Sequence, residues 1–306
     1  MVEGVTVIVP SLDYGQYIGT AIGSALAQDS ILQLLVQDNC SQDNTVAVLK
    51  SVSDDRLVWN SRPDGGQSAA INGLISAASH EVIGWLNADE LYTRYALEVA
   101  IGAFKRYPHI DVIYGDSLFC DEAGTLLRLV SSVGPSEALL RAKGCYISTC
   151  AMFFRSKVGR AFPLREDLRS IMDWEWYLRL MAGGIRFGYV PVPLGIYRVH
   201  PRQITYTEPQ SRLREITDVR TVGEQAALRR QVGGGRTRQA MALYAISGDL
   251  IYKARKIVGG GTRRERTMKF YAGADLLWPH RSAAQVDRAM EQIVEEWHRA
   301  GASLQC

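Results

Sequence analysis

Short apolar runs alternate with helical patterns along the first 115 residues. Helical spacing is clearest over 15–27, where apolar side chains fall at positions 18, 21, 22, 25 and 26. Strands are expected at 5–9, 34–36, 57–59, 82–86 and 111–114. Helices are expected at 15–27, 45–52, 67–78 and 93–106. This alternation predicts an α/β fold with a Rossmann-like, mostly parallel sheet flanked by helices.

The pattern changes after Gly115. Residues 118–120 and 126–130 flank a turn-forming segment at 121–124, which predicts a hairpin. Later elements are expected as a helix at 173–182, strands at 186–190 and 194–199, and helices at 210–230, 237–257, 264–276 and 283–299. The chain is therefore divided into residues 1–115, residues 116–205 and a C-terminal helical extension at 206–306.

The composition is that of an ordinary globular protein of 306 residues with a formal net charge of +3. The charge is uneven. Residues 1–205 hold 18 Lys and Arg against 21 Asp and Glu, whereas residues 206–306 hold 17 against 11. The basic part includes the segment 253–269, which suits either a solvated face or a peripheral contact with an anionic membrane. No aromatic-interleaved basic platform accompanies it, so nucleic acid is not an expected partner.

The five cysteines are scattered and lack CxxC spacing, which favours reduced thiols in a cytoplasmic protein. The chain opens on Met-Val-Glu-Gly, without the basic and apolar regions of a secretory signal. No apolar run reaches the ~18 residues of a membrane span. The expected location is the cytoplasm, with 253–269 as the candidate for peripheral attachment to the inner face of the membrane.

Polar clusters follow four of the expected strands at the point where each strand ends. The clusters read SLDY (11–14), DNCS (38–41), DGG (64–66) and NADE (87–90). A parallel sheet brings the carboxyl ends of its strands to one edge, so the clusters should converge there. Each cluster alone also suits helix capping. Together they suit a nucleotide, which needs an aromatic for stacking, a carboxylate for a base N–H and glycines for close backbone approach.

Longer stretches keep a recognisable order. VTVIVPSLDYGQYIGTAIGSALAQ, VQDNCSQDNTVAVL, PDGGQSAAIN and IGWLNADELY come first, and VIYGDSLFCDEAGTLL, CAMFFRSKVG, MDWEWYLRL and YRVH follow. Together they resemble a family 2 glycosyltransferase of the GT-A fold, over roughly residues 5–203. The resemblance implies an inverting, metal-dependent enzyme that moves a sugar from a nucleotide-diphosphate sugar to a hydroxyl of a glycan or lipid-linked acceptor, as in polysaccharide or cell-envelope biosynthesis. UDP is the expected nucleotide on base rate alone.

The resemblance assigns residues 1–115 to the donor, and residues 116–205 to the acceptor and catalysis. The segment after the first strand would pack on base and ribose, and the acid after the second strand would hydrogen-bond the base. The implied nucleotide-binding residues are Pro10, Ser11, Asp13, Tyr14, Asp38, Asn39, Asp64, Gly65, Gln67, Asn72, Asn87 and Ala88. Ala69 departs from the family pattern, which often has an acid there.

The NADE cluster matches the family's metal-binding motif. The resemblance implies that Asp89 holds Mn²⁺ or Mg²⁺, and hard cations of this kind often use one or two carboxylates plus substrate phosphates. Asn87 stands where an Asp is commoner and would touch ribose or water. Glu90 replaces a second Asp, and its longer reach argues against direct ligation. His200, in YRVHPRQIT, resembles the family position that reaches the metal or diphosphate.

Catalysis requires a base that takes the proton of the acceptor hydroxyl. Asp173, in MDWEWYLRL, matches the family's catalytic acid residue at a helix start, and an N-cap is its alternative role. A position at a helix N-terminus should lower its pKa and weaken it as a base. Direct displacement would invert the anomeric carbon. Trp174 and Trp176 are candidates for stacking on an acceptor sugar, with core packing as the alternative.

Two other classes of protein stay open on the sequence. Asn87, Glu90 and Ala69 all depart from the family pattern, so a catalytically weak sugar-nucleotide-binding module, acting as a partner in a complex, is the alternative to an enzyme. A nucleotidyltransferase has a similar sheet. The chain lacks the glycine- and lysine-rich loop after the first strand that such enzymes tend to carry.

Overall fold

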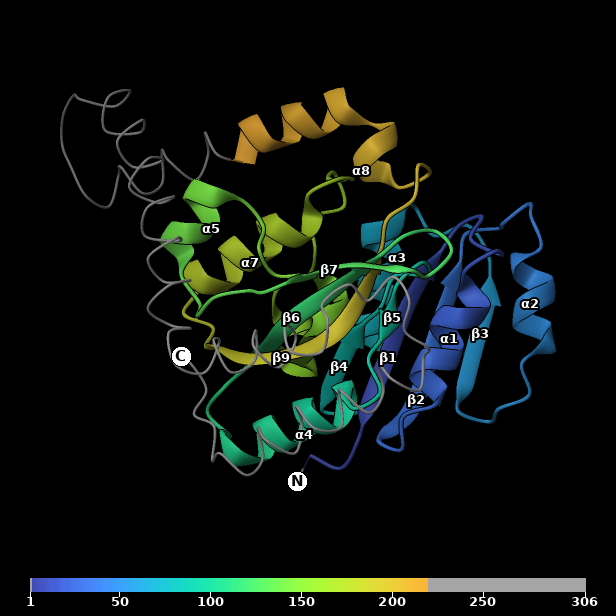
Figure 1. Ribbon diagram of the computed structural model, residues 1–306, viewed down its shortest axis with the longest axis horizontal. Coiled ribbons are helices and arrows are strands. Elements are labelled where there is room, and N and C mark those ends of the chain that lie inside the picture. The colour runs from blue at the N-terminus through green and yellow to red at the C-terminus, as the bar shows by residue number, and fades with distance from the viewer. Residues whose placement is uncertain (1, 220–306) are drawn as a thin grey trace.

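A computed structural model describes residues 2–219, in which a single mixed sheet is flanked by helices on both faces (Figure 1). The strands are β1 (Val5–Ser11), β2 (Ile31–Asp38), β3 (Leu57–Ser61), β4 (Val82–Trp85), β5 (Leu91–Tyr92), β6 (Val112–Cys120), β7 (Leu126–Val130), β8 (Met152–Arg155) and β9 (Phe187–Arg198). The helices are α1 (Ile18–Leu26), α2 (Thr45–Ser51), α3 (Gln67–Ala77), α4 (Ala96–Arg106), α5 (Glu137–Lys143), α6 (Ser156–Ala161), α7 (Met172–Ala182) and α8 (Ile204–Thr207), with a 3-10 turn η1 (Thr149–Ala151). Residues 209–219 are also helical.

The strand order is β3-β2-β1-β4-β8-β6-β9-β5, and β7 pairs with β6 outside this path. The first four strands of that order run parallel, as predicted for the first part of the chain. β2 lies on one side of β1 and β4 on the other, so the chain reverses its direction of travel across the sheet at β1. In parallel α/β sheets, ligands bind beyond the carboxyl ends of the strands at such a switch point.

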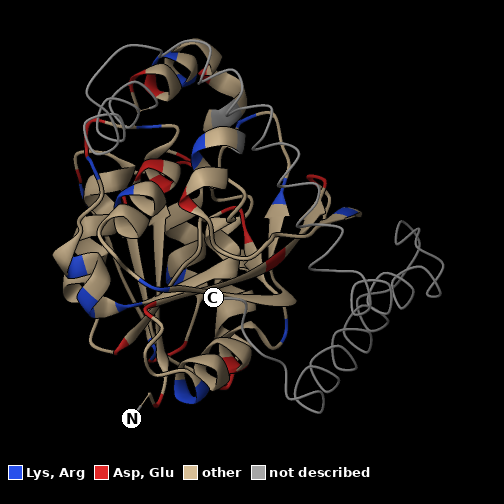
Figure 2. Cartoon of the chain, turned by 90° about the vertical axis from the view of Figure 1, so that its left-hand side faces the viewer, with Lys and Arg blue, Asp and Glu red and all other residues tan. Residues whose placement is uncertain are grey.

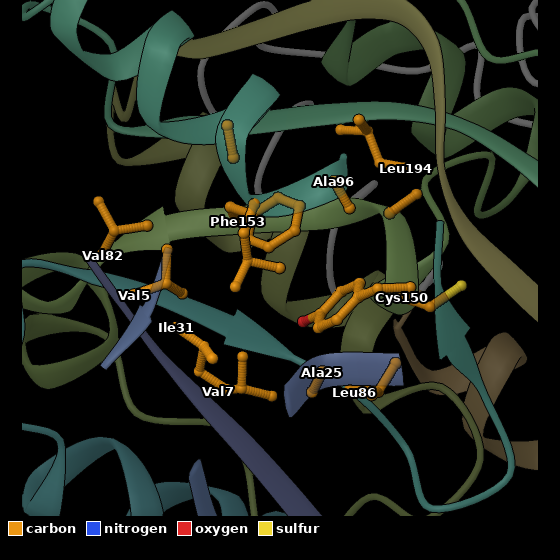
Figure 3. Packing of buried hydrophobic residues seen from close by; sticks show 14 of the residues in the cluster. Val5, Val7, Ala25, Ile31, Val82, Leu86, Ala96, Cys150, Phe153 and Leu194 are labelled. Atoms are coloured by element: carbon orange, nitrogen blue, oxygen red, sulfur yellow. The ribbon is translucent and has the colours of Figure 1, made fainter. Parts of the chain in front are cut away.

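The side chains of β1 alternate between two apolar cores. Val5, Val7 and Val9 point into the core that α1 and α4 cover, and Ile8 points into the core that α3 and α7 cover. Figure 3 shows Val5, Val7 and Val82 packed in the first core with Phe153. Both faces of a parallel sheet are buried, which explains why these strands read as continuous apolar runs. Full burial of each such side chain is worth about 1.5–3 kcal/mol.

Two predicted breaks in the sheet are wrong. The strand expected at 111–114 and the first arm of the hairpin form one strand, β6, and the strands expected at 186–190 and 194–199 form one strand, β9. Pro191 and Pro193 lie within β9, and the register of β6 and β9 shifts around Asp116, opposite Pro193. Proline is tolerated at such an irregularity, since the regular ladder is already interrupted there.

Several short elements have no counterpart in the sequence prediction. They are β5, α5, η1, β8, α6 and α8. The helix expected at 93–106 begins at Ala96, because the chain first pairs with β9 through β5. The helix expected at 210–230 is seen as far as residue 219. The predicted helices 237–257, 264–276 and 283–299 and the basic segment 253–269 lie outside the described residues.

Figure 2 shows acidic and basic residues interspersed along the described part of the chain. Its sheet includes strands from both predicted halves, and the boundaries at 115 and 205 stay predictions. Within residues 2–219, every helix is too short or too polar to cross a bilayer.

Gly195 is expected to tolerate no side chain, because the backbone of η1 passes very close to it. A Cβ at this position of β9 would lie 2.3 Å from the Cys150 carbonyl oxygen, which is backbone of η1 and cannot turn aside. We expect Gly195→Ala to lower the free energy of unfolding by about 1–3 kcal/mol in urea titrations.

Gly73→Ala provides the matched control. Gly73 lies inside α3, is exposed, and has open space where a Cβ would be. Alanine is the better helix former by about 1 kcal/mol, so this variant should be as stable as the parent or more stable. Equal effects of the two substitutions would contradict the close approach at Gly195.

Candidate functional site

The loops that follow β1 and β2 are bound to each other. The Asp13 N–H donates to Ser41 Oγ at 2.7 Å, and the Gln42 N–H donates to Asp13 Oδ1 at 2.7 Å. Asp13 and Cys40 both adopt a φ of 55°, in the left-handed region that side chains other than glycine seldom enter. Such strained backbone persists only where surrounding contacts impose it, and it concentrates at functional sites.

Asp38 lies at the end of β2 and is fully buried. Its Oδ2 accepts hydrogen bonds from the Ser41 N–H at 3.0 Å and from Ser61 Oγ at 2.5 Å, and the Ser41 hydroxyl donates to Oδ1. The carboxylate therefore ties the loops after β2 and β3 to the sheet.

The loop after β3 continues this network. The Asp64 N–H donates to Asn39 Oδ1 at 3.3 Å, and Asp64 Oδ1 accepts from the Gly66 N–H at 2.8 Å. Burial, and then the charge of Asp38, raise the pKa of Asp64. Gly65 and Gly66 have φ values of 84° and 113°, which glycine adopts without strain. The predicted convergence of these three clusters on one sheet edge is thus seen.

The carboxamide of Asn87 makes three hydrogen bonds to other side chains. Its Oδ1 accepts from Trp85 Nε1 at 3.0 Å and from Gln67 Nε2 at 3.1 Å, and its Nδ2 donates to Thr149 Oγ1 at 3.2 Å. These contacts use both ends of the carboxamide. An aspartate at this position could accept the first two bonds but could not donate to Thr149.

Asp89 and His200 form a buried pair at the end of β4. Asp89 Oδ2 accepts from His200 Nε2 at 2.9 Å and from Gln203 Nε2 at 3.3 Å, although 111 residues separate Asp89 from His200. Gln203 Nε2 also donates to the Arg198 carbonyl at 2.7 Å. Both members of the pair are over nine-tenths buried. Within the described chain, His200 Nδ1 is buried without a hydrogen-bond partner.

Aromatic rings and guanidinium groups surround this pair. The His200 ring lies 4.7 Å from the Tyr17 ring and 5.9 Å from the Tyr14 ring, measured between centroids. The guanidinium carbons of Arg198 and Arg202 lie 5.2 and 5.5 Å from the Tyr17 centroid, within cation–π range. Burial raises the pKa of Tyr14 well above its usual value, and the charges of Asp89 and Glu90 raise it further.

The hairpin between β6 and β7 closes this side of the site. The Tyr17 hydroxyl donates to Glu122 Oε1, and Arg198 Nη1 donates to the Glu122 carbonyl at 2.9 Å. Burial also raises the pKa of the Tyr17 hydroxyl. Tyr17 and Gln203 were not among the predicted site residues. Gln203 follows His200 by three positions in the matched YRVHPRQIT stretch, and that spacing is the signal by which it could have been found.

Glu90 is buried beneath Asn87. Its Oε2 accepts from the Asn87 N–H and from Thr149 Oγ1, both at 3.2 Å. Burial raises the pKa of Glu90 to about 8, and the neighbouring charge of Asp89 adds to the effect. Glu90 is therefore largely protonated at neutral pH and adds little negative charge beside Asp89.

Asp173 lies in the first turn of α7 and is half-buried. Oδ1 accepts from the Trp174 N–H at 2.7 Å, and Oδ2 accepts from Cys145 Sγ at 3.7 Å. Burial raises the pKa of Asp173, and it outweighs the lowering by the backbone N–H and the thiol. The expected lowering of this pKa at the helix N-terminus is thus wrong in its net direction, because desolvation penalises the charged form more strongly.

Three predicted site residues lie elsewhere. Trp174 and Trp176 are core residues, and their indole N–H groups donate to the carbonyls of Leu140 at 2.8 Å and Phe162 at 2.6 Å. Neither presents a ring face on which an acceptor sugar could stack. Asn72 clamps the loop at 164–166, since its Oδ1 accepts from the Leu164 N–H at 2.8 Å.

The predicted metal ligands suit a cation only in part. Residues 2–219 contain no group of three or more His, Cys, Asp or Glu side chains arranged to hold a metal ion. Asp89 and His200 supply one carboxylate and one imidazole. Two protein ligands of this kind fit Mn²⁺ or Mg²⁺ where phosphate oxygens of a substrate complete the coordination. The unpartnered His200 Nδ1 is consistent with a site that is completed by ligand.

A switch-point edge of a parallel sheet, lined by polar loops, is where α/β proteins of this architecture bind their ligands. Residues 6–162 match the sequence model of the family described as "Glycosyl transferase family 2". The chain belongs to glycosyl transferase family 2.

Curated relatives are distant. An uncharacterised glycosyltransferase of Nostoc sp. is 27% identical over 172 residues, which cover 52% of this chain and 53% of the Nostoc protein. The succinoglycan biosynthesis protein ExoU of Rhizobium meliloti is 26% identical over 218 residues, 62% of each chain. This chain thus spans about half of the first relative's length.

Among solved structures, residues 1–349 of S. aureus TarS in complex with UDP-GlcNAc superpose with a TM-score of 0.60 at 14% identity. The match covers 97% of this chain and 92% of that one. The same TarS segment in complex with UDP gives a TM-score of 0.58 at 17% identity. These likenesses establish the GT-A fold, as predicted from the order of the sequence stretches.

The pKa of Glu90 makes a prediction about pH. A carboxyl group whose pKa rises from 4.5 unfolded to about 8 folded stabilises the protein below pH 4.5, and this contribution is lost as pH rises toward 8. Glu90→Gln mimics the protonated form. Relative to the parent, the free energy of unfolding of Glu90→Gln should rise by a few kcal/mol between pH 5 and pH 8.5. A difference that stays constant across this range in urea titrations would contradict a neutral Glu90.

Proposed function

We propose that the chain transfers a sugar from a nucleotide-diphosphate sugar to an acceptor hydroxyl. The observation that carries the proposal is the buried Asp89–His200 pair at the carboxyl edge of the parallel strands, beside Tyr14 and the guanidinium groups of Arg198 and Arg202. UDP is the favoured nucleotide, because the TarS structures of the same fold contain UDP and UDP-GlcNAc.

The donor would lie across the loops after β1 and β2. Tyr14 is only partly buried and keeps a neutral phenol, which suits packing against a base or ribose. Arg202 is exposed beside Asp89's partner His200 and offers a guanidinium to the diphosphate. Asp89 and His200 would hold Mn²⁺ or Mg²⁺, which in such sites neutralises the charge of a departing diphosphate.

Asp173 is proposed as the base. Its raised pKa brings it nearer to the range in which a carboxylate accepts a proton efficiently at neutral pH. The acceptor hydroxyl would lose its proton to Asp173 as its oxygen bonds to the anomeric carbon and the nucleotide diphosphate departs. One displacement without a covalent intermediate inverts that carbon. A single displacement needs no second carboxylate as a nucleophile.

The acceptor is proposed to be a glycan or a lipid-linked glycan. Relatives include the succinoglycan biosynthesis protein noted above and a Pasteurella multocida chondroitin synthase, which is 24% identical over 187 residues. The synthase match covers 19% of that protein's length, so it supports the class of acceptor only.

Donor binding gives the first test. Isothermal titration with UDP should show binding that Mn²⁺ strengthens at least about tenfold, since a cation held by Asp89 and His200 would offset the negative charge of the diphosphate. Asp89→Asn should abolish most of the Mn²⁺ effect. Asp167→Asn is the matched control, because Asp167 is exposed and pairs with Arg165. UDP affinity that is independent of Mn²⁺ in the parent protein would refute the metal role.

Catalysis gives the second test. UDP release from UDP-N-acetylglucosamine, with water as the acceptor, should fall about 10²–10⁴-fold in Asp173→Asn, since general-base catalysis contributes that much. UDP affinity should stay unchanged, and Asp167→Asn should keep full turnover. If the parent binds UDP and UDP-sugars but turns over none of them, even with glycan acceptors, the chain is a binding module and the enzyme proposal fails.

A further inference from the structure

Asp173 has an unusual hydrogen-bond partner. Its two oxygens are held by different donors: Oδ1 by the Trp174 backbone N–H at 2.7 Å, and Oδ2 by the thiol of Cys145 at 3.7 Å. A backbone N–H to a carboxylate is a strong bond, whereas S–H is a weak donor. The carboxylate is therefore fixed through Oδ1, and Oδ2 keeps most of its capacity to accept a proton.

The thiol has a second acceptor within reach. Cys145 Sγ lies 3.3 Å from the Ile147 carbonyl oxygen as well as 3.7 Å from Asp173 Oδ2. One S–H can serve only one of them at a time. An ionised Asp173 attracts the hydrogen, and a protonated Asp173 leaves it to Ile147. Asp173 would alternate between the ionised and the protonated form in each turnover. The Cys145 thiol can follow this change by donating to Asp173 in the first form and to the Ile147 carbonyl in the second.

We propose that Cys145 is a positioning residue for the catalytic base Asp173. Its thiol orients Asp173 Oδ2 through a weak hydrogen bond, which leaves that oxygen able to receive the proton of the acceptor hydroxyl. The inference rests on the proposed function, because it takes Asp173 as the base. The contact joins the segment between α5 and η1 to the first turn of α7, 28 residues apart in the chain.

The surroundings keep the thiol protonated. Although the residue keeps an exposed surface, desolvation of the Cys145 thiol by the protein atoms around it raises its pKa above the usual value, and the charge of Asp173 raises it further. Arg212, on the helix at 209–219, opposes both effects and lowers the pKa of Asp173 as well as that of the thiol. Tyr177 follows Asp173 by one helical turn, and its buried hydroxyl has no hydrogen-bond partner among the described residues. The pKa of that hydroxyl is also raised, so Tyr177 stays neutral.

The helix that carries Arg212 is tied to the loop before α7. Glu215 accepts from the Arg169 N–H at 3.0 Å and from the Ser170 N–H at 2.9 Å. Cations and neutral donors thus face Asp173 from its own helix, from the Cys145 segment and from the helix at 209–219. Among these groups, the thiol is the one whose donor strength a single substitution can raise or remove without altering charge.

The pH dependence of turnover tests the proposal. UDP release from UDP-N-acetylglucosamine is measured from pH 5 to 9 for the parent, Cys145→Ser and Cys145→Ala. The serine hydroxyl is a stronger donor, so the acidic limb of kcat should move down by about half a pH unit. The plateau should fall severalfold as the base weakens. Alanine removes the donor and should move the limb upward. Thermal unfolding and UDP affinity verify that each variant is folded.

A second readout does not depend on turnover. Cys145 is exposed, and alkylation by iodoacetamide at pH 8 can be followed by mass spectrometry of the peptide at 144–155. Cys150 lies in the same peptide but is fully buried, and fragmentation separates the two. Asp173→Asn removes the neighbouring charge, so Cys145 should react at least about threefold faster than in the parent. Cys40, which is distant in the fold, provides the reference rate.

The outcomes separate this inference from the proposed function. Full turnover by Asp173→Asn would remove the base and this inference with it. An inactive Asp173→Asn together with unshifted pH profiles in both Cys145 variants would overturn this inference and leave the proposed function standing. An alkylation rate at Cys145 that is unaffected by Asp173→Asn would show that the two side chains do not interact, and would also overturn it.

Discussion

The buried hydrogen bond between Asp89 and His200 is the contact on which the site depends. A carboxylate withdrawn from water is costly unless it is paired and hydrogen-bonded. Here the imidazole and the Gln203 amide provide the partners, and both come from the segment that follows β9. That segment must therefore return to the end of β4. Its return brings Arg198 and Arg202 over Tyr17 and completes one wall of the site.

Two residues of the NADE cluster, Asn87 and Glu90, add little negative charge to the site at neutral pH. Glu90 is kept protonated by burial, and Asn87 offers a neutral carboxamide where the family often has an acid. Asn87 also performs a task that an acid could not, because it accepts from Trp85 and Gln67 while it donates to Thr149. What reads in the sequence as a weakened metal motif is, in the fold, a hydrogen-bonded support for the segment that carries Asp89.

The two acids assigned to chemistry have different surroundings. Asp89 accepts hydrogen bonds from an imidazole and an amide, and these neighbours suit its proposed role as a metal ligand. Asp173 is held by one backbone N–H and a thiol, and burial raises its pKa. Two acids in one site can take different roles when their surroundings differ in hydrogen bonding and in burial.

Much of this could be predicted from local pattern. Apolar runs and helical spacing are local properties, and they located β1 to β4 and their helices. Asx and glycine residues at strand ends located the loops, and the order of the stretches pointed to the family and so to Asp89, His200 and Asp173. Short elements such as β5 and β8 were missed. They are defined by pairing with distant strands, and their own four or fewer residues carry too little periodicity.

Only the tertiary structure decided the hydrogen-bond partners of the site side chains and how deeply each side chain is buried. Trp174 and Trp176 have the residue type of a sugar platform, but α7 turns both into the core. Nothing in the sequence marks Cys145 as the neighbour of Asp173, or Thr149 as the partner of Glu90. The sequence by itself determined the alternation of strands and helices and which residue types stand where the strands end, because both are local properties of the chain. Protonation and hydrogen bonding were decided by the fold, because they depend on how completely distant segments exclude water.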